Sequence, residues 1–283
     1  MRKPIQKILP KLIGSYFNSL SLVAPRKAGE QAFLLFSTPQ KGRALPHQEP
    51  FLNAAKYKRH AVKNLQIQSY HWPGSGPKVL LVHGWESNTY RWKALIEHLQ
   101  QEDYDIYAFD APAQGKSDGK LLNAVRYTHC LEQMVDDLQP EIIIGHSVGA
   151  MTTLYRQYLR PAPEIKQLVL LGPPGELQEI MADYQKICQL KPRVMRALED
   201  YTQTTYGFSF DEFSAPAFAK AVTQQGLLIH DKHDPVTPIS ASRNIHAVWP
   251  ESELIETEGL GHSLHDPRVY QMITSFLQKA KAS

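Results

Sequence analysis

Short apolar runs alternate with amphipathic stretches over residues 77–283, and this alternation is the feature that most restricts the fold. The runs are residues 78–82, 105–109, 141–144, 167–171, 226–229 and 253–256. Strands that are apolar on both faces are typical of a parallel sheet covered by helices on each side. We therefore predict an α/β fold with a mostly parallel central sheet. The predicted helices between the runs are residues 90–99, 121–138, 148–159, 239–249 and 268–280.

Two segments depart from this alternation. Residues 64–72 alternate polar and apolar side chains, which predicts an antiparallel edge strand paired with the residues just before it. The residues between 171 and 226 have helical patterns at 175–190, 192–205 and 209–223, which predicts a small helical cap inserted before the next strand. The predicted organisation is an N-terminal extension (1–64), a core (65–171 and 225–283) and a cap (172–224).

The sharpest chemical signal is GHSVG at residues 145–149, which follows an apolar run and opens a predicted helix. A serine at such a strand-to-helix turn exposes its hydroxyl at the carboxyl edge of the sheet. Ser147 is therefore the predicted nucleophile. A serine hydroxyl needs a base to take its proton. His262, in the glycine-containing loop after residues 253–256, is the predicted base, with His265 as the alternative.

An acid and an oxyanion hole complete the predicted site. Asp231 and Asp234 both follow the run at 226–229, and the D-x-x-x-P spacing to Pro238 favours Asp234 as the residue that orients the base. The turn HGW at 83–85 is expected to aim the backbone N–H of Trp85 at the serine. With the N–H of Val148, it would stabilise a tetrahedral oxyanion.

Together these segments resemble the α/β-hydrolase fold superfamily. HGW at 83–85, FDAPAQGKSDG at 109–119, GHSVG at 145–149, HDKHDPVTP at 230–238 and GLGH at 259–262 fall in that superfamily's order, and the resemblance covers residues 77–283. It implies a Ser147–Asp234–His262 triad and an oxyanion hole formed by the amides of Trp85 and Val148. One departure is Ala113, where many members have glycine, which leaves the turn plausible.

A serine nucleophile indicates acyl transfer, because dehalogenases and epoxide hydrolases of this fold need an aspartate in its place. We therefore predict a serine hydrolase of the carboxylesterase type that acts on a small to medium acyl ester through an acyl-enzyme, without a cofactor. Thioesterase, lysophospholipase and C–C bond hydrolase activities use the same triad and stay open. A non-catalytic ligand-binding protein on the same fold is the alternative from another class.

Aromatic residues and histidines near the predicted site suggest a substrate pocket and raise the question of a metal. The predicted substrate pocket contains Trp85, Tyr90, His146, Phe208 and Phe210. For the two cap phenylalanines, packing in a small core of the cap itself is the favoured interpretation, and Trp85 and Tyr90 are the better pocket candidates. The histidine pairs 230/233 and 262/265 raise the question of a metal, but neither HExxH nor a cysteine-rich metal signature occurs, so no metal is expected.

Charge is divided unevenly along the chain. The formal net charge is +3, yet residues 1–64 hold 12 Lys/Arg against two acids, and residues 65–283 hold 19 against 26. Apolar residues at positions 5, 8, 9, 12, 13, 16, 17 and 20 predict a basic amphipathic helix that either passes through Pro10 or begins there. We expect such a helix to dock on the acidic body of its own domain or on a second subunit in a homodimer, with an anionic membrane surface as the alternative.

Location and other partners follow from what the sequence lacks. No apolar stretch is long enough for a membrane span, and Lys7, Pro10 and Lys11 interrupt any signal-peptide core. Cys130 and Cys188 cannot form a disulfide framework, which fits a reducing compartment. We expect a cytoplasmic protein, with peripheral contact to the inner face of the membrane as an option. No nucleic-acid binding is expected, because no base-reading module is present.

Overall fold

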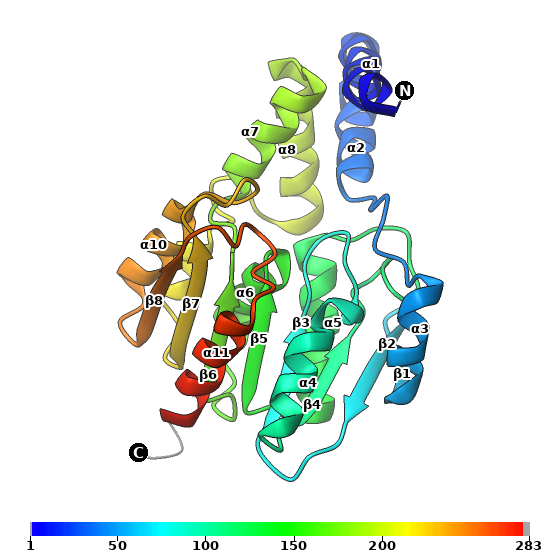
Figure 1. Cartoon of the computed structure of the whole chain (residues 1–283). Helices are drawn as coiled ribbons and strands as arrows, with labels where there is room; N and C mark the ends of the chain where they lie inside the picture. The colour runs from blue at the N-terminus through cyan, green and yellow to red at the C-terminus, as the bar shows by residue number, and fades with distance from the viewer. Residues whose placement is uncertain (1, 280–283) are drawn as a thin grey trace. The chain divides into compact units, whose positions relative to one another are not determined.

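The computed structural model describes residues 2–279 (Figure 1), and they form two compact units. One unit joins Met1–Thr38 to Glu176–Ser214, and the other joins Pro39–Gly175 to Ala215–Ser283. Each unit has an apolar core of its own. We call them the helical unit and the sheet unit.

The sheet unit is built on an eight-stranded sheet within the described residues. Its strands are β1 (Lys56–Val62), β2 (Leu65–Trp72), β3 (Lys78–Val82), β4 (Asp105–Phe109), β5 (Ile142–His146), β6 (Gln167–Leu171), β7 (Gln225–Asp231) and β8 (Ser252–Thr257). The spatial order is β1-β2-β4-β3-β5-β6-β7-β8. β2 pairs antiparallel with β1 and with β4, and every other pairing is parallel. The predicted mostly parallel sheet and antiparallel edge pair are confirmed.

Helices cover both faces of this sheet. The elements are η1 (Pro46–Gln48), α3 (Glu49–Ala54), η2 (Thr89–Trp92), α4 (Lys93–Gln101), α5 (Ala124–Leu138), α6 (Val148–Leu159), α9 (Ala215–Ala219), α10 (Ile239–Val248) and α11 (Pro267–Lys279). α4 and α11 pack on one face, and α5, α6, α9 and α10 on the other. Residues on the central strands, such as Leu80 and Leu81, are fully buried whichever face they point to. The apolar runs are therefore continuous because both faces are covered.

Several helix boundaries differ from those predicted by one to three residues. α5 begins at Ala124 instead of residue 121, because the side chain of Asn123 accepts the N–H of Arg126 and caps the helix. α11 begins at Pro267, and its predicted end at Ala280 lies outside the described residues.

The helical unit consists of α1 (Arg2–Val23), α2 (Pro25–Phe36), α7 (Leu177–Cys188) and α8 (Pro192–Tyr206). α2 packs along α8, and α1 packs on α2, α7 and α8 (Figure 1). Glycine permits the close approach of α1, because a Cβ at Gly14 would lie 1.6 Å from the carbonyl oxygen of Cys188. Residues from the first two helices, including Phe17 and Phe33, share one core with Leu198 of α8. The basic N-terminal helices are therefore part of the same unit as the cap helices.

Two predictions about segments are corrected, and one alternative that the sequence left open is decided. The N-terminal extension was predicted as residues 1–64. In the structure the part that packs in the helical unit ends at Thr38, and β1 belongs to the sheet unit because it pairs with β2. The helix predicted at 209–223 shrinks to Ala215–Ala219, because Ser209 forms a local turn with the side chains of Asp211 and Glu212. α1 does not begin at Pro10 but passes through it.

Two other expectations bear on the environment of the chain. Cys130 and Cys188 are buried and unpaired thiols. Among the described helices, none is both long and apolar enough to cross a membrane.

Candidate active site

Ser147 lies at the turn between β5 and α6, where the backbone is strained. Its φ is +54° and its ψ is −125°, in a region that non-glycine residues rarely adopt. The two glycines of GHSVG make the turn possible. A Cβ at Gly149 would lie 2.2 Å from the carbonyl oxygen of Val82, and one at Gly145 would lie 2.7 Å from Cα of Ala150. The glycines at these two positions are therefore required by packing against β3 and α6.

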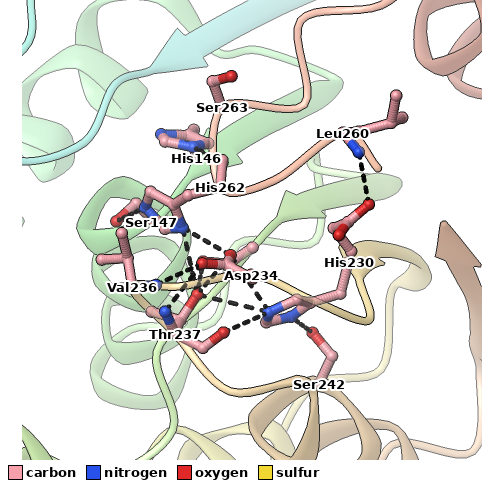
Figure 2. A network of polar contacts seen from close by, with 12 residues as sticks. His146, Ser147, His230, Asp234, Val236, Thr237, Ser242, Leu260, His262 and Ser263 are labelled. Carbon is pink, nitrogen blue, oxygen red and sulfur yellow. Dashed lines mark hydrogen bonds and ion pairs between the residues drawn. The ribbon is translucent and has the colours of Figure 1, made fainter. Parts of the chain in front are cut away.

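The structure brings Ser147, His262 and Asp234 together (Figure 2). Nε2 of His262 lies 3.0 Å from Oγ of Ser147, and Nδ1 lies 2.7 Å from Oδ2 of Asp234. A carboxylate can only accept, so Nδ1 carries the proton and Nε2 has its lone pair directed at the serine hydroxyl. This is the tautomer that can take the proton from Ser147.

Asp234 is buried and fully hydrogen bonded. Oδ1 accepts the N–H groups of Val236 and Thr237, at 2.7 and 3.0 Å, and Oδ2 accepts the hydroxyl of Thr237 at 2.9 Å. Burial by itself raises the pKa of this carboxyl, but hydrogen bonds from His230, His262 and the two backbone N–H groups outweigh it and hold the pKa well below its usual range. The residue beside His262 is therefore an aspartate anion.

Asp231 and His265, the alternative candidates for the acid and the base, lie elsewhere. Asp231 accepts the N–H of Leu260 at 2.8 Å and the hydroxyl of Thr257 at 3.1 Å. It thereby holds the loop that carries His262 and does not contact the imidazole ring itself. His265 lies on the exposed surface. Of the candidates, Asp234 and His262 are therefore the two that the structure joins by a hydrogen bond, and His262 in turn contacts Ser147.

The residues predicted to form the oxyanion hole lie in or next to segments that contact Ser147. Val148 is the first residue of α6, and the first N–H groups of a helix have no partner within the helix. The HGW turn passes on the other side, and a Cβ at Gly84 would lie 2.9 Å from Cβ of Ser147. Nδ1 of His83 donates to the carbonyl of Gly84, and its Nε2 accepts the N–H of Ala111. This histidine fixes the turn that precedes Trp85.

Burial keeps the two histidines beside the site neutral. It lowers the pKa of His83 to about 4 and lowers the pKa of His146 well below its ordinary value. Nε2 of His146 donates to the backbone carbonyl of His262 at 2.8 Å. Arg91 donates to the carbonyl of Ser263 at 3.0 Å. The loop that carries the predicted base is thus held by hydrogen bonds from two sides, which explains why His262 stays within hydrogen-bonding distance of Ser147.

Sequence reasoning missed two residues behind the acid. Nδ1 of His230 lies 2.7 Å from the hydroxyl of Ser242, and its Nε2 donates to the carbonyl of Thr237 and lies 3.4 Å from Oδ2 of Asp234 (Figure 2). Gly172, at φ +54°, is close enough that a Cβ would lie 3.5 Å from both atoms of the Asp234–His262 hydrogen bond. The signal for His230 was its i, i+4 spacing to Asp234; Gly172 has no comparable signal.

Three of the aromatic residues predicted to line a substrate pocket pack against other side chains of the protein. The ring of Tyr90 is half-buried and meets His47 and Phe51 edge-on. Phe210 lies in the core of the helical unit and is only 7% exposed, and Phe208 packs against Tyr206 and Phe213. Packing accounts for both phenylalanines without a ligand. Substrate contacts by Trp85, Tyr90, His146, Phe208 and Phe210 stay predictions.

The described part of the chain brings no three His, Cys, Asp or Glu side chains into a group that could hold a metal ion. His230 has both ring nitrogens engaged by Ser242 and Thr237, and His262 has both engaged by Ser147 and Asp234. One histidine of each pair that raised the metal question is thus engaged in hydrogen bonds through both ring nitrogens.

Comparisons with known proteins agree with this geometry. A family model described as serine aminopeptidase, S33, matches residues 76–208, and one described as TAP-like protein matches residues 210–283. A pimeloyl-[acyl-carrier protein] methyl ester esterase of Pseudoalteromonas atlantica is 27% identical over 108 residues, 38% of this chain and 41% of that protein. The chain thus spans about two fifths of the length of this relative.

Two further comparisons cover more of the chain. The protein of the same name from Nitrosomonas europaea is 23% identical over 237 residues, covering 67% of this chain and 90% of that one. Among solved structures, an esterase of Pyrococcus furiosus superposes with a TM-score of 0.63 at 22% identity, over 86% of this chain and 96% of the other. That superposition bears on the fold. With the matching family models and the arrangement of the sheet, it establishes that the chain belongs to the α/β-hydrolase fold superfamily.

Proposed function

We propose that the chain is a carboxylic ester hydrolase that works through an acyl-enzyme on Ser147. The observation that carries the proposal is the contact of 3.0 Å between Nε2 of His262 and the serine hydroxyl, with Nδ1 held by an aspartate anion. Relatives named as methyl ester esterases support the ester bond as the target. The strained turn at Ser147 supports a nucleophile, because such strain is tolerated where function needs it.

The proposed reaction has two halves. Oγ of Ser147 attacks the ester carbonyl while Nε2 of His262 takes its proton, and Asp234 stabilises the imidazolium that forms. The N–H groups of Val148 and Trp85 receive the oxyanion, and two such donors contribute about 3–4 kcal/mol each in comparable sites. The imidazolium then protonates the leaving alcohol. Water, deprotonated by the same histidine, attacks the acyl-enzyme and releases the carboxylic acid.

The primary test is hydrolysis of p-nitrophenyl esters from acetate to laurate. We expect the highest kcat/KM for short or medium acyl chains, and a loss of at least about 1000-fold in Ser147→Ala, because the hydroxyl is the bond-forming group. Ser263→Ala is the matched control, since Ser263 is an exposed serine next to His262. Retention of most activity by Ser147→Ala would reject the assignment of the nucleophile.

A second panel separates reactions that share the triad. Acyl-CoA, a lysophospholipid, a C–C cleavage substrate and an alanine p-nitroanilide test thioesterase, lysophospholipase, C–C hydrolase and aminopeptidase activity; the last is included because of the family description. An ester turned over at least tenfold faster than every other substrate supports the proposal. A wild-type chain that a fluorophosphonate probe does not label on Ser147 would favour a non-catalytic protein on this fold.

A further inference from the structure

α1 packs into the helical unit through one of its faces. Phe17 lies in the core of that unit, with Ile13 packed against it. Asn18 binds the end of α7 twice: its Nδ2 donates to the carbonyl of Gln189, and its Oδ1 accepts the N–H of Lys191. Gly14 lies against the carbonyl of Cys188. This face is accounted for by the fold.

A second face of α1 is apolar and exposed. Leu22 is also exposed, at 68%, but lies about 40° outside the arc that the other apolar residues share. Those others, Ile8, Leu9, Leu12, Tyr16 and Val23, are 53%, 54%, 62%, 54% and 83% exposed. At about 100° per residue they fall within one arc of about 100°, which is the width of an apolar stripe that helices normally bury. Five large exposed side chains along one line of a single helix exceed the scattered apolar residues of an ordinary surface. We call this set the α1 stripe.

The charge around the α1 stripe indicates what would cover it. Residues 1–29 contain six Lys/Arg and no acid, and the first acid is Glu30. Lys11 of α1 and Arg26 and Lys27 of α2 are exposed. A helix with an apolar stripe, flanking lysine and arginine and no acidic residue has the chemistry of a segment that lies in the interface of an anionic membrane.

A second copy of the chain fits the same face less well. Most homodimers have two-fold symmetry, so the α1 stripe of one copy would face the same stripe of the other. Exposed Lys11 of each α1 would then lie near the same interface, and α1 holds no acid to match it. Like charges brought together across an interface oppose association, whereas anionic lipid headgroups neutralise them.

From the exposed stripe and its charge, we propose that α1 docks the protein on anionic lipid, with the stripe inserted among the headgroups and the opposite face still packed on α7 and α8. The insertion is peripheral, since none of the described helices could cross a membrane. The proposal concerns the helical unit alone and does not depend on the esterase activity.

The test is co-sedimentation of the full-length protein with unilamellar vesicles. One set contains phosphatidylcholine only, and the other contains phosphatidylcholine with 30% phosphatidylglycerol. We expect binding to the anionic vesicles in 50 mM NaCl, at least tenfold weaker binding to the neutral ones, and a marked loss in 500 mM NaCl because salt screens the attraction.

The double variant Leu9→Glu/Leu12→Glu tests the stripe. Its binding to anionic vesicles should fall at least tenfold, with circular dichroism and Tm unchanged because both side chains are exposed. The matched control is Leu45→Glu/Leu159→Glu, which replaces two leucines of the sheet unit that are 50% and 55% exposed and should bind as the wild type does. It has the same change in charge and residue type away from α1.

Three results would overturn the proposal. The first is a folded wild-type protein that stays in the supernatant with anionic vesicles. The second is equal loss of binding in both double variants, which would assign the effect to net charge alone. The third is a dimer in sedimentation velocity that Leu9→Glu/Leu12→Glu converts to a monomer, which would assign the α1 stripe to a second copy.

Discussion

Replacing Asp234 with asparagine tests the predicted triad most directly, because the structure dictates how the new amide would be oriented. The oxygen at the Oδ1 position accepts two backbone N–H groups, those of Val236 and Thr237. An NH2 group there would leave both donors unpaired, at about 1–3 kcal/mol for each. The amide oxygen must therefore stay at Oδ1, and the NH2 group must take the Oδ2 position that faces His262.

This orientation forces the wrong tautomer on His262. Nδ1 would have to accept from the NH2 group, so the proton would move to Nε2, and Nε2 could no longer take the proton of Ser147. We expect kcat/KM for a p-nitrophenyl ester to fall about 1000- to 10,000-fold, or ~4–5.5 kcal/mol of transition-state stabilisation. Fluorophosphonate labelling of Ser147 should slow in proportion, since it needs the same proton transfer.

Asp231→Asn is the control for this experiment. Asp231 is also buried, but its carboxylate accepts from the backbone of Leu260 and His233 and from the hydroxyl of Thr257. An amide there must leave one donor unpaired, so we expect a loss of stability of about 1–3 kcal/mol and a much smaller loss of activity. More than a tenth of wild-type activity in Asp234→Asn would refute the tautomer argument. Equal loss in both variants at unchanged Tm would refute the choice of Asp234.

Three other predictions concern pH and packing. Because the folded-state pKa of Asp234 lies below its unfolded value, its ionisation contributes stability above about pH 4 that is lost as the pH falls below it; the difference in Tm between the wild type and Asp234→Asn should therefore shrink between pH 7 and pH 3. Gly149→Ala places a methyl group 2.2 Å from the carbonyl of Val82, and urea unfolding should show a loss of at least about 2 kcal/mol or no folded protein. Gly14→Ala places one 1.6 Å from the carbonyl of Cys188, so α1 should separate from α7, and limited proteolysis should cut α1 at least tenfold faster than in the wild type.

The elements predicted best are those fixed by local pattern. Strand β3 was predicted to the residue, because a run buried on both faces has sharp apolar limits. The sequence places Ser147, Asp234 and His262 near one another because each one follows a strand at the carboxyl edge of the same sheet, and the structure brings their side chains within hydrogen-bonding distance. For these features, local sequence and tertiary structure point to the same answer.

Features that depend on distant contacts could not be predicted. Residues 209–223 have helical spacing, but the carboxylate of Glu212 accepts both the backbone N–H and the hydroxyl of Ser209, which forms a turn instead. His230 looks like any histidine at a strand end until Asp234 and Thr237 fold back on it. Gly172 matters only because the Asp234–His262 pair lies above it, 50 or more residues away in sequence.

The structure divides the basic segment 1–64 between the two units, at Thr38 and Pro39. The role of its positive charges can therefore be considered separately for each half. Residues 1–38 hold six Lys/Arg and one acid, and residues 39–64 hold the other six and one acid. In the second half, the guanidinium of Arg43 donates to the carbonyls of Ser117 and Gly119, and that of Arg59 donates to the carbonyl of Lys116. These charges therefore help to hold a loop of the sheet unit.

In the first half, Lys11, Arg26 and Lys27 are exposed, so packing inside the helical unit does not account for their charge. Selection for stability alone does not favour six like charges within 29 residues that also hold six large exposed apolar side chains, since the charges repel one another and the apolar surface promotes aggregation. An anionic surface offsets both costs at once, because headgroups neutralise the charges while the acyl boundary covers the stripe. Unexplained charge and unexplained apolar surface thus lie together on the first two helices, α1 and α2, and vesicle binding is the measurement that addresses both.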